Sequence, residues 1–247
     1  NPTGSIKDRI IKYIVERAIK DGAISEGTTL VEATSGNTGI SLSAIGASLG
    51  LQVKIIMPKN MSSERRDMMR MFGAEIIDVG DSDFEAAIQK RNELVEQGCW
   101  SPMQFESYLN IECHRNTTAI EIINQLPQST NFAAFVSGVG TGGTIMGVRE
   151  AVIARGLSTH ICMVRPAEPP HLHGIQGISD GANFLANPNL FDHLLPVKTV
   201  NARARAMRFA KEHGALVGIS AGANLLAAEK YIKLYIPRGS VVTILCD

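Results

Sequence analysis

Short apolar runs along the chain alternate with longer stretches in which apolar residues recur at helical spacing. The runs predict strands at 29–32, 53–57, 75–78, 133–137, 160–164, 215–217 and 241–245. Most of these runs are unbroken β-branched or apolar stretches, as expected of parallel strands covered on both faces. The alternation therefore predicts an α/β fold with open, mostly parallel sheets covered by helices.

The chain opens, without an initiator methionine, on NPTGSIKDRIIKYIVERAI, which predicts an amphipathic helix. Pro2 and Gly4 set a tight entry, and Ser5 is the expected N-cap. Its predicted buried positions are Ile10, Ile11, Ile14, Val15 and Ala18. Lys7 then stands at the positive end of the helix dipole, a mild cost of up to about 1 kcal/mol. Taken alone, Lys7 reads as an ordinary surface lysine.

Composition limits the classes of function. The chain has 247 residues, 45% of them hydrophobic, and 24 Lys and Arg balance 24 Asp and Glu. No net field draws it to nucleic acid or an anionic membrane, so a small substrate is expected. No apolar run approaches the roughly 20 residues of a membrane span, and we expect a cytoplasmic protein. The irregular stretch 98–110 predicts a lobe boundary, with a smaller lobe at 1–106 and a larger lobe at 107–247.

Cysteine and histidine spacing gives no sign of a metal site. Cys99, Cys113, Cys162 and Cys246 lie far apart without a CxxC pair, which favours reduced structural thiols. His171 and His173 could share one face of a strand, but surface histidines are the commoner outcome in a PAEPPHLHG loop. We therefore assign no metal.

Three glycine-rich segments follow predicted strands, where open α/β sheets bind ligands. The first offers hydroxyls, an amide and backbone N–H groups suited to a carboxylate, from Thr34, Ser35, Gly36, Asn37 and Thr38. The second resembles a phosphate cradle at a helix start and contains Gly138, Gly140, Thr141, Gly142, Gly143 and Thr144. The third, ALVGISAGANLL, places Ser220 before a helix of small residues.

The second segment, GVGTGG, also partly matches a dinucleotide fingerprint. A nicotinamide site requires an acidic residue about 20 positions further on, at a strand end. Glu150 falls inside the helix instead, and the following strand ends at Arg165. The nicotinamide interpretation is therefore disfavoured.

Together, these motifs resemble the fold-type II pyridoxal-phosphate enzymes, and among them the cysteine synthase (O-acetylserine sulfhydrylase) and cystathionine β-synthase branch. The matching segments occur in the family's order over nearly the whole chain: NPTGSIKDR, TSGNTG, MPKNMSSERRDMMRMFGAEI, GTGGT, HGIQGI and GISAGA. The resemblance implies a two-lobed, tryptophan synthase β-like architecture with pyridoxal 5′-phosphate in the cleft. It also reverses the interpretation of Lys7, which would bond to the cofactor as a Schiff base and shuttle protons.

The resemblance also assigns roles to the other motif residues. Asn37 would hydrogen-bond the cofactor's ring oxygen, and Ser220 would face its pyridine nitrogen. The 5′-phosphate would be held by Gly140, Thr141, Gly142, Gly143 and Thr144. The substrate side would comprise Thr34, Ser35, Gly36, Asn37, Thr38, Gln104 and Gly177.

The reaction implied is β-replacement, in which O-acetylserine and sulfide give cysteine and acetate through α-aminoacrylate. The partners implied are an amino-acid substrate, a sulfur nucleophile and a second copy in a homodimer. Ile178 is followed by Ser179, Asp180 and Gly181, where the branch usually has a further glycine, so the activated serine stays open. Alternatives are a cystathionine β-synthase-like or O-phosphoserine-using enzyme, a serine or threonine dehydratase, and an inactive binding homologue. Relatives have segments before and after the matched region, so this chain is expected to lack terminal segments.

Overall fold

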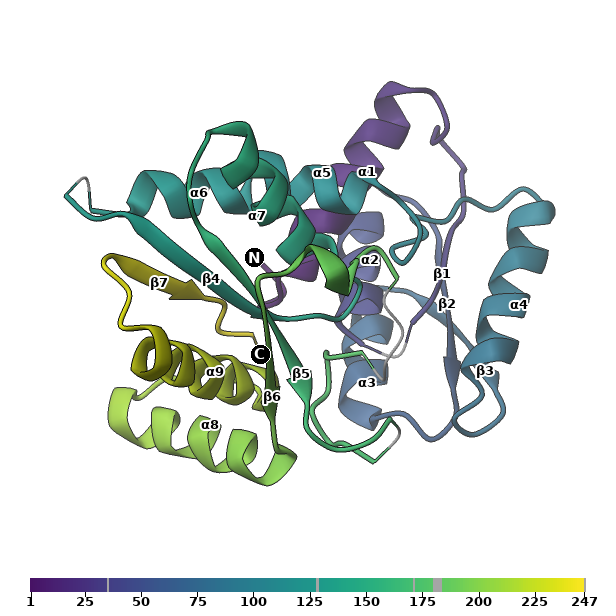
Figure 1. The fold of residues 1–247 in the computed structure, drawn as a ribbon. Helices are drawn as coiled ribbons and strands as arrows, with labels where there is room; N and C mark the ends of the chain where they lie inside the picture. The colour runs from purple at the N-terminus through teal and green to yellow at the C-terminus, as the bar shows by residue number, and fades with distance from the viewer. Residues whose placement is uncertain (35, 128, 171, 180–183, 247) are drawn as a thin grey trace. The chain divides into compact units, whose positions relative to one another are not determined.

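The computed structural model describes residues 1–34, 36–127, 129–170, 172–179 and 184–246 (Figure 1). The chain divides into two compact units, Asn1–Ser107 and Tyr108–Asp247. This division falls within the irregular stretch that suggested a boundary between 106 and 107.

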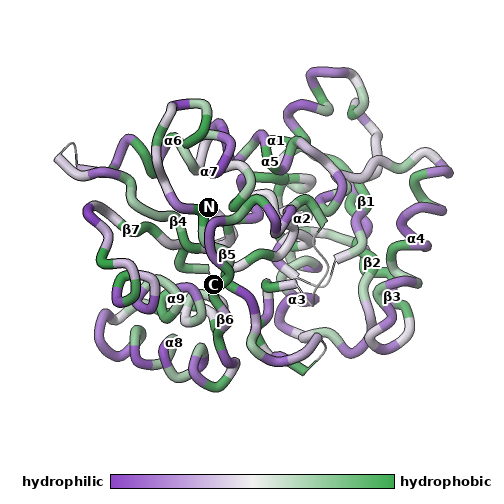
Figure 2. Tube along the Cα trace, viewed as in Figure 1, coloured by the Kyte–Doolittle hydropathy of each residue, from purple (hydrophilic) through white to green (hydrophobic). Residues whose placement is uncertain are grey.

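The first unit contains a parallel three-stranded sheet. Its order is β1 (Leu30–Ala33), β2 (Val53–Pro58), β3 (Glu75–Val79). One face carries α4 (Phe84–Glu96), and the other carries α2 (Asn37–Ser48) and α3 (Ser63–Met71) (Figure 1). The opening helix α1 (Lys7–Lys20) packs on α2. All of β1 is buried, and β2 is a mostly hydrophobic stretch (Figure 2), which fits strands covered on both faces.

The second unit contains a parallel four-stranded sheet. Its order is β6 (His193–Val197), β5 (His160–Pro166), β4 (Phe132–Gly138), β7 (Ser240–Thr243). One face is covered by α9 (Ile219–Tyr235), on which α8 (Thr199–His213) packs. The other face carries α7 (Gly143–Ala154), which packs against α5 (Leu109–Asn116) and α6 (Thr118–Gln125) (Figure 1). A 3-10 turn, η1 (Pro188–Leu190), precedes β6. Val136 and Val164 belong to the core under α9, whereas Phe135 and Ile161 belong to the core under α7.

The opening helix is confirmed, and its five predicted core positions are all buried. Its start differs slightly from the prediction. The helix begins at Lys7 with Ile6 at the N-cap, while Ser5 accepts the Lys7 backbone N–H at 3.0 Å. Gly4 turns the chain with φ of +93°, a conformation that favours glycine.

The strand prediction at 215–217 is wrong. Residues 215–218 form neither helix nor strand and join α8 to α9, and Leu216 is 94% exposed. These four residues connect two helices that pack on one another, and a connection this short contains no strand. The sequence also missed β6, whose Pro196 argues against an interior strand; β6 lies at the sheet edge, where proline is tolerated.

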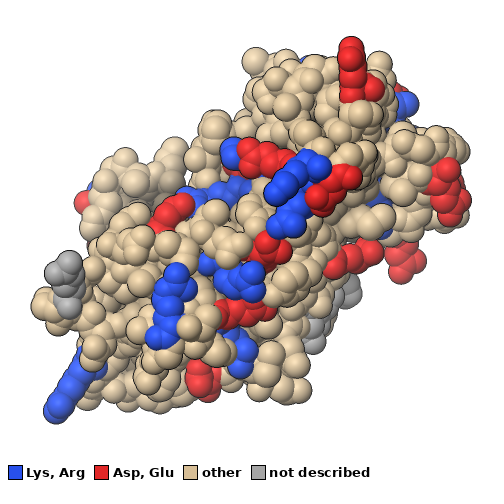
Figure 3. Space-filling model, turned by 90° about the horizontal axis from the view of Figure 1, so that it is seen from above, with Lys and Arg blue, Asp and Glu red and all other residues tan. Residues whose placement is uncertain are grey.

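Charges of both signs interleave on the face seen in Figure 3, in keeping with the balanced composition. Among the described residues, the longest apolar helices fall short of what a membrane crossing needs.

Candidate active site

In the first unit, the loop predicted to bind a carboxylate begins at the carboxyl end of β1. Thr34 follows the strand directly, and its hydroxyl accepts the Gly36 backbone N–H at 3.3 Å. The helix α2 then begins at Asn37, so the loop ends at the positive end of a helix dipole. Ser35 lies outside the described residues. The arrangement can bind an anion of carboxylate size.

Gln104 comes to this loop from 66 residues along the chain. The Thr38 hydroxyl donates to Gln104 Oε1 at 2.7 Å, and both side chains are buried. The hydroxyl hydrogen of Thr38 is thereby used inside the protein. Thr38 can contribute to anion binding through its backbone N–H at the start of α2.

Gln104 contacts a buried ion pair between Glu32 and Arg91. The Glu32 carboxylate has no exposed surface, lies 3.6 Å from Arg91 Nη1 and accepts the Gln104 backbone N–H at 3.4 Å. Burial raises the pKa of Glu32 to about 7, against the opposing attraction of Arg91. Sequence reasoning missed both residues, because Glu32 sits in an apolar strand and Arg91 in an apparently amphipathic helix.

Lys7 is half-buried at the first position of α1, and its neighbour Asp8 ties that helix to α2. The Asp8 carboxylate accepts the Thr3 backbone N–H at 2.8 Å and the hydroxyls of Thr3 and Ser41 at 2.5 Å each. Ser41 lies one turn along α2 from Asn37. The carboxylate therefore holds the helix starts that carry Lys7 and Asn37.

In the second unit, the segment predicted to bind a phosphate, residues 140–144, leads from β4 into α7. We call it the phosphate-type loop. Gly142 caps α7 with φ of +94°, and a Cβ there would lie 2.5 Å from the Ala186 nitrogen. A Cβ on Gly140 would lie 2.7 Å from the Gly177 carbonyl oxygen. The loop backbone is fixed further by the Leu185 N–H, which donates to the Thr141 carbonyl at 3.0 Å. Glycine is needed here because neighbouring backbone packs against the loop.

The donor set of this loop fits a phosphate. The Thr141 hydroxyl oxygen accepts from Asn110 Nδ2 at 3.0 Å, and the Thr144 hydroxyl lies 3.2 Å from His114 Nε2. The first turn of α7 carries no acidic side chain. Backbone N–H groups and hydroxyls at a helix start suit a dianion. Asn110 and His114 gave no signal in the sequence, because they lie on a different helix.

Gly177 and Ser220 lie beside this loop. Ser220 is buried at the second position of α9, and a Cβ on Gly177 would lie 3.9 Å from its hydroxyl. Asn224, one turn further, accepts the Gly138 N–H at 2.7 Å and donates to the Ile244 carbonyl at 2.8 Å. These two bonds fix the start of α9 against β4 and against the segment that follows β7. The structure thus brings Gly140, Gly177 and Ser220 together.

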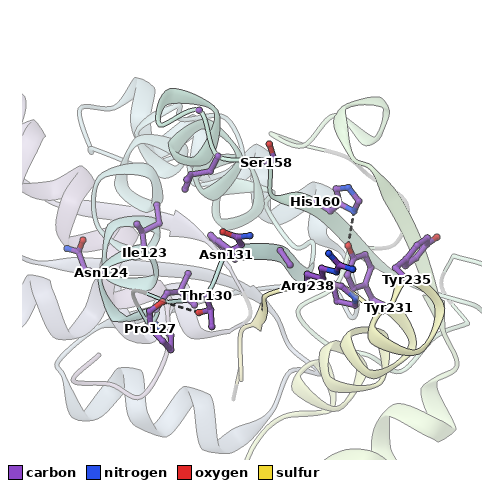
Figure 4. Close-up of a pocket in the computed structure, with 16 residues that line it drawn as sticks. Ile123, Asn124, Pro127, Thr130, Asn131, Ser158, His160, Tyr231, Tyr235 and Arg238 are labelled. Carbon is purple, nitrogen blue, oxygen red and sulfur yellow. Dashed lines mark hydrogen bonds between the residues drawn. The ribbon is translucent and has the colours of Figure 1, made fainter.

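A cavity of about 920 Å³ in the second unit contains none of the residues that the sequence singled out (Figure 4). It opens at the amino ends of β4 and β5, near Phe132 and His160, where the Tyr231 hydroxyl lies 2.7 Å from His160 Nδ1. Open α/β sheets bind ligands at the opposite, carboxyl ends. His173 is described and His171 is not, and the described residues contain no cluster of three or more metal-ligating side chains.

Comparison with known proteins identifies the family. A family model described as "Pyridoxal-phosphate dependent enzyme" matches residues 1–247. Cysteine synthase B of Campylobacter jejuni is 40% identical over 100% of this chain and 85% of its own length. Cysteine synthase of Staphylococcus aureus (strain Mu50) is 38% identical over 99% of this chain and 82% of its own length.

A solved hydrogen sulfide-producing enzyme of Fusobacterium nucleatum has a TM-score of 0.93 at 38% identity and covers 100% of this chain and 78% of its own. The chain therefore belongs to the pyridoxal-phosphate dependent enzyme family, and its fold is the two-sheet α/β fold that the motifs suggested. Pyridoxal phosphate is accordingly its cofactor.

Proposed function

We propose that this chain catalyses β-replacement on O-acetylserine, with sulfide as the nucleophile and cysteine and acetate as products. The observation that carries the proposal is Ser220, a buried neutral hydroxyl at the start of α9 beside Gly177 and the phosphate loop. A neutral partner at the pyridine nitrogen keeps the ring a moderate electron sink, which favours loss of a β-substituent over transamination. The cysteine synthases to which the chain is similar support the same reaction.

The chain's residues take the following roles in the proposal. When bound, pyridoxal phosphate supplies an aldehyde for amines and an electron-accepting ring. Lys7 would bond to the aldehyde carbon and, once freed, would act as the base that takes the Cα proton. Asn37 hydrogen-bonds the ring oxygen, and the phosphate contacts come from Gly140, Thr141, Gly142, Gly143 and Thr144. Substrate contacts come from Thr34, Ser35, Gly36, Asn37, Thr38, Gln104 and Gly177.

The atoms of the overall reaction balance. The Cβ–O bond of O-acetylserine breaks and acetate leaves with the electron pair of that bond. The sulfide sulfur then forms a bond to Cβ, and Lys7 returns the proton to Cα. We further propose that the enzyme is cytoplasmic and works as a homodimer. Sedimentation of the purified protein can test the dimer.

Reduction with borohydride tests the proposal at its covalent step. The protein should be yellow, and reduction followed by peptide mapping should place the pyridoxyl group on Lys7 in the NPTGSIK segment. The matched control is Lys12→Arg, which alters an exposed lysine of the same helix and should leave the label unchanged. A label on another lysine, or none, would overturn the assignment.

Turnover separates the sibling reactions. O-acetylserine, O-phosphoserine and serine, each with sulfide or homocysteine, should give cysteine fastest from O-acetylserine and sulfide. Faster cystathionine formation would favour a cystathionine β-synthase-like enzyme, and ammonia with a keto acid would favour a dehydratase. Sulfide release from cysteine is a further candidate, because the Fusobacterium nucleatum relative is a hydrogen sulfide-producing enzyme. Ligand binding without turnover would favour an inactive homologue.

A further inference from the structure

Two side chains of helix α5 contact the phosphate-type loop. Asn110 and His114 stand four residues apart on α5 and are 0% and 2% exposed. Asn110 contacts the hydroxyl of Thr141, and His114 contacts the hydroxyl of Thr144. Two buried polar side chains of one helix face therefore meet the two hydroxyls of the loop.

The bonds to Thr141 decide what its hydroxyl can do. A threonine hydroxyl has one hydrogen to donate and two lone pairs that accept. The Thr141 oxygen accepts from Asn110 Nδ2 at 3.0 Å and from the Gly143 backbone N–H at 3.4 Å. Both lone pairs are engaged, so the remaining hydrogen has to be donated. Such a hydroxyl suits an anion, which can only accept.

The hydrogen bonds of His114 set the role of the Thr144 hydroxyl in the same way. His114 Nδ1 lies 2.8 Å from the Thr118 hydroxyl, and its Nε2 lies 3.2 Å from the Thr144 hydroxyl. If Thr118 donates to Nδ1, the ring hydrogen sits on Nε2 and is donated to Thr144. The Thr144 hydrogen is then released for a phosphate oxygen. A bound dianion favours this tautomer, because a hydrogen bond to a charged acceptor is the stronger one.

We propose that Asn110 and His114 are positioning residues of the phosphate site. By donating to Thr141 and Thr144, they direct both loop hydroxyls to donate to the phosphate. They thereby make the protein select pyridoxal phosphate over pyridoxal. This inference rests on the proposed function, since it takes the loop as the site of the 5′-phosphate.

Equilibrium binding to the apo-protein tests the proposal without any turnover. The two probes are pyridoxal phosphate and pyridoxal, which lacks the phosphate. In His114→Asn, the shorter side chain still reaches Thr118 and loses the donor to Thr144. Its dissociation constant for pyridoxal phosphate should rise about tenfold to a hundredfold, the usual worth of a hydrogen bond to a charged group. Its constant for pyridoxal should stay within about twofold of the parent's.

Matched variants separate positioning from general damage. His114→Gln places an amide N–H near the position of Nε2 and should restore most of the affinity. Asn110→Ala should show the same selective loss as His114→Asn. Arg115→Gln, which alters a solvent-facing residue of α5 that contacts Tyr108 and Glu150, should change neither constant.

Each outcome decides the matter. Equal weakening of both constants in His114→Asn, or no change in either, would overturn the positioning role. A parent protein that fails to bind pyridoxal phosphate would instead overturn the proposed function. Where the variants fail to fold, nitrogen-15 NMR of the parent's histidines gives the answer. The proposal requires the His114 hydrogen on Nε2 with the cofactor bound, and a hydrogen on Nδ1 alone would contradict it.

Discussion

Glu32 is a carboxyl group without exposed surface on β1, an edge strand of the three-stranded parallel sheet. The Ala33 and Gln104 backbone N–H groups donate to it, and Arg91 lies 3.6 Å away, itself buried. These contacts do not fully offset the loss of water, because burial still raises its pKa to about 7. The residue therefore titrates in the folded protein near neutral pH.

At the residue scale, we predict how the free energy of unfolding changes with pH. Unfolded, Glu32 returns to a pKa of 4.5, so between that value and about 7 the folded state binds the proton more tightly. The free energy of unfolding should therefore fall as pH rises through this window, by roughly 1–3 kcal/mol. Glu32→Gln should remove most of this fall, measured by urea unfolding at a series of pH values.

The matched control is Glu106→Gln, which removes the other carboxylate near Arg91, 3.4 Å from its Nη2. Glu106 is largely exposed, so its ion pair with Arg91 should contribute little to stability. A pH dependence that persists in Glu32→Gln would show that other groups cause it.

At the residue scale, the sequence indicated the residues proposed to bind ligands better than the residues that hold them in place. Lys7, Asn37 and the 140–144 loop stand in glycine-rich segments beside predicted strands, where residue type alone is informative. Their supports are distant in sequence: Asn110 lies 31 residues from Thr141, and His114 lies 30 residues from Thr144. A pair formed only by folding leaves no local pattern to detect.

At the scale of elements, the errors in strand prediction have the same cause: packing between distant segments is not visible in a local sequence pattern. Strands β1 to β5 and β7 follow from short, mostly apolar runs, as expected of strands in helix-covered parallel sheets. The run at 215–217 has that composition but serves as a connection between α8 and α9. Packing of those helices is close, since a Cβ on Gly222 would lie 2.0 Å from the Ala202 carbonyl oxygen.

The element-scale prediction tests the carboxylate that joins α1 to α2. Ser41→Ala should lower the free energy of unfolding by about 1–3 kcal/mol, because Asp8 loses a hydrogen bond to its charged group. In an Asp8→Ala background the same change should cost close to nothing. A double-mutant cycle by urea unfolding measures this coupling, expected at about 0.5–3 kcal/mol.

Ser48→Ala provides the control in the same helix. The Ser48 hydroxyl donates only to the nearby Ile45 carbonyl and is exposed, so its loss should change stability by at most about 0.5 kcal/mol. If the Asp8 and Ser41 changes prove additive, the two helices are held by packing alone.

At the scale of the whole molecule, the four cysteines report on folding in both units. All four are reduced cysteines, as their spacing predicted. Cys113 and Cys162 are buried, whereas Cys99 and Cys246 are partly exposed. Burial, with the nearby Asp192 carboxylate, raises the pKa of Cys162 to about 12, so its thiolate is scarce at ordinary pH.

The whole-molecule prediction follows from these differences. In the native protein at about pH 8, a thiol reagent such as dithionitrobenzoate should label Cys99 and Cys246 quickly and spare Cys113 and Cys162. Unfolding exposes the buried pair and returns the pKa of Cys162 toward 9.0, so four thiols should then react without any reductant. Peptide mapping of the early product identifies the sites. Fast labelling of Cys162 in the native protein would mean that β5 is open to solvent, and fewer than four thiols after unfolding would reveal a disulfide.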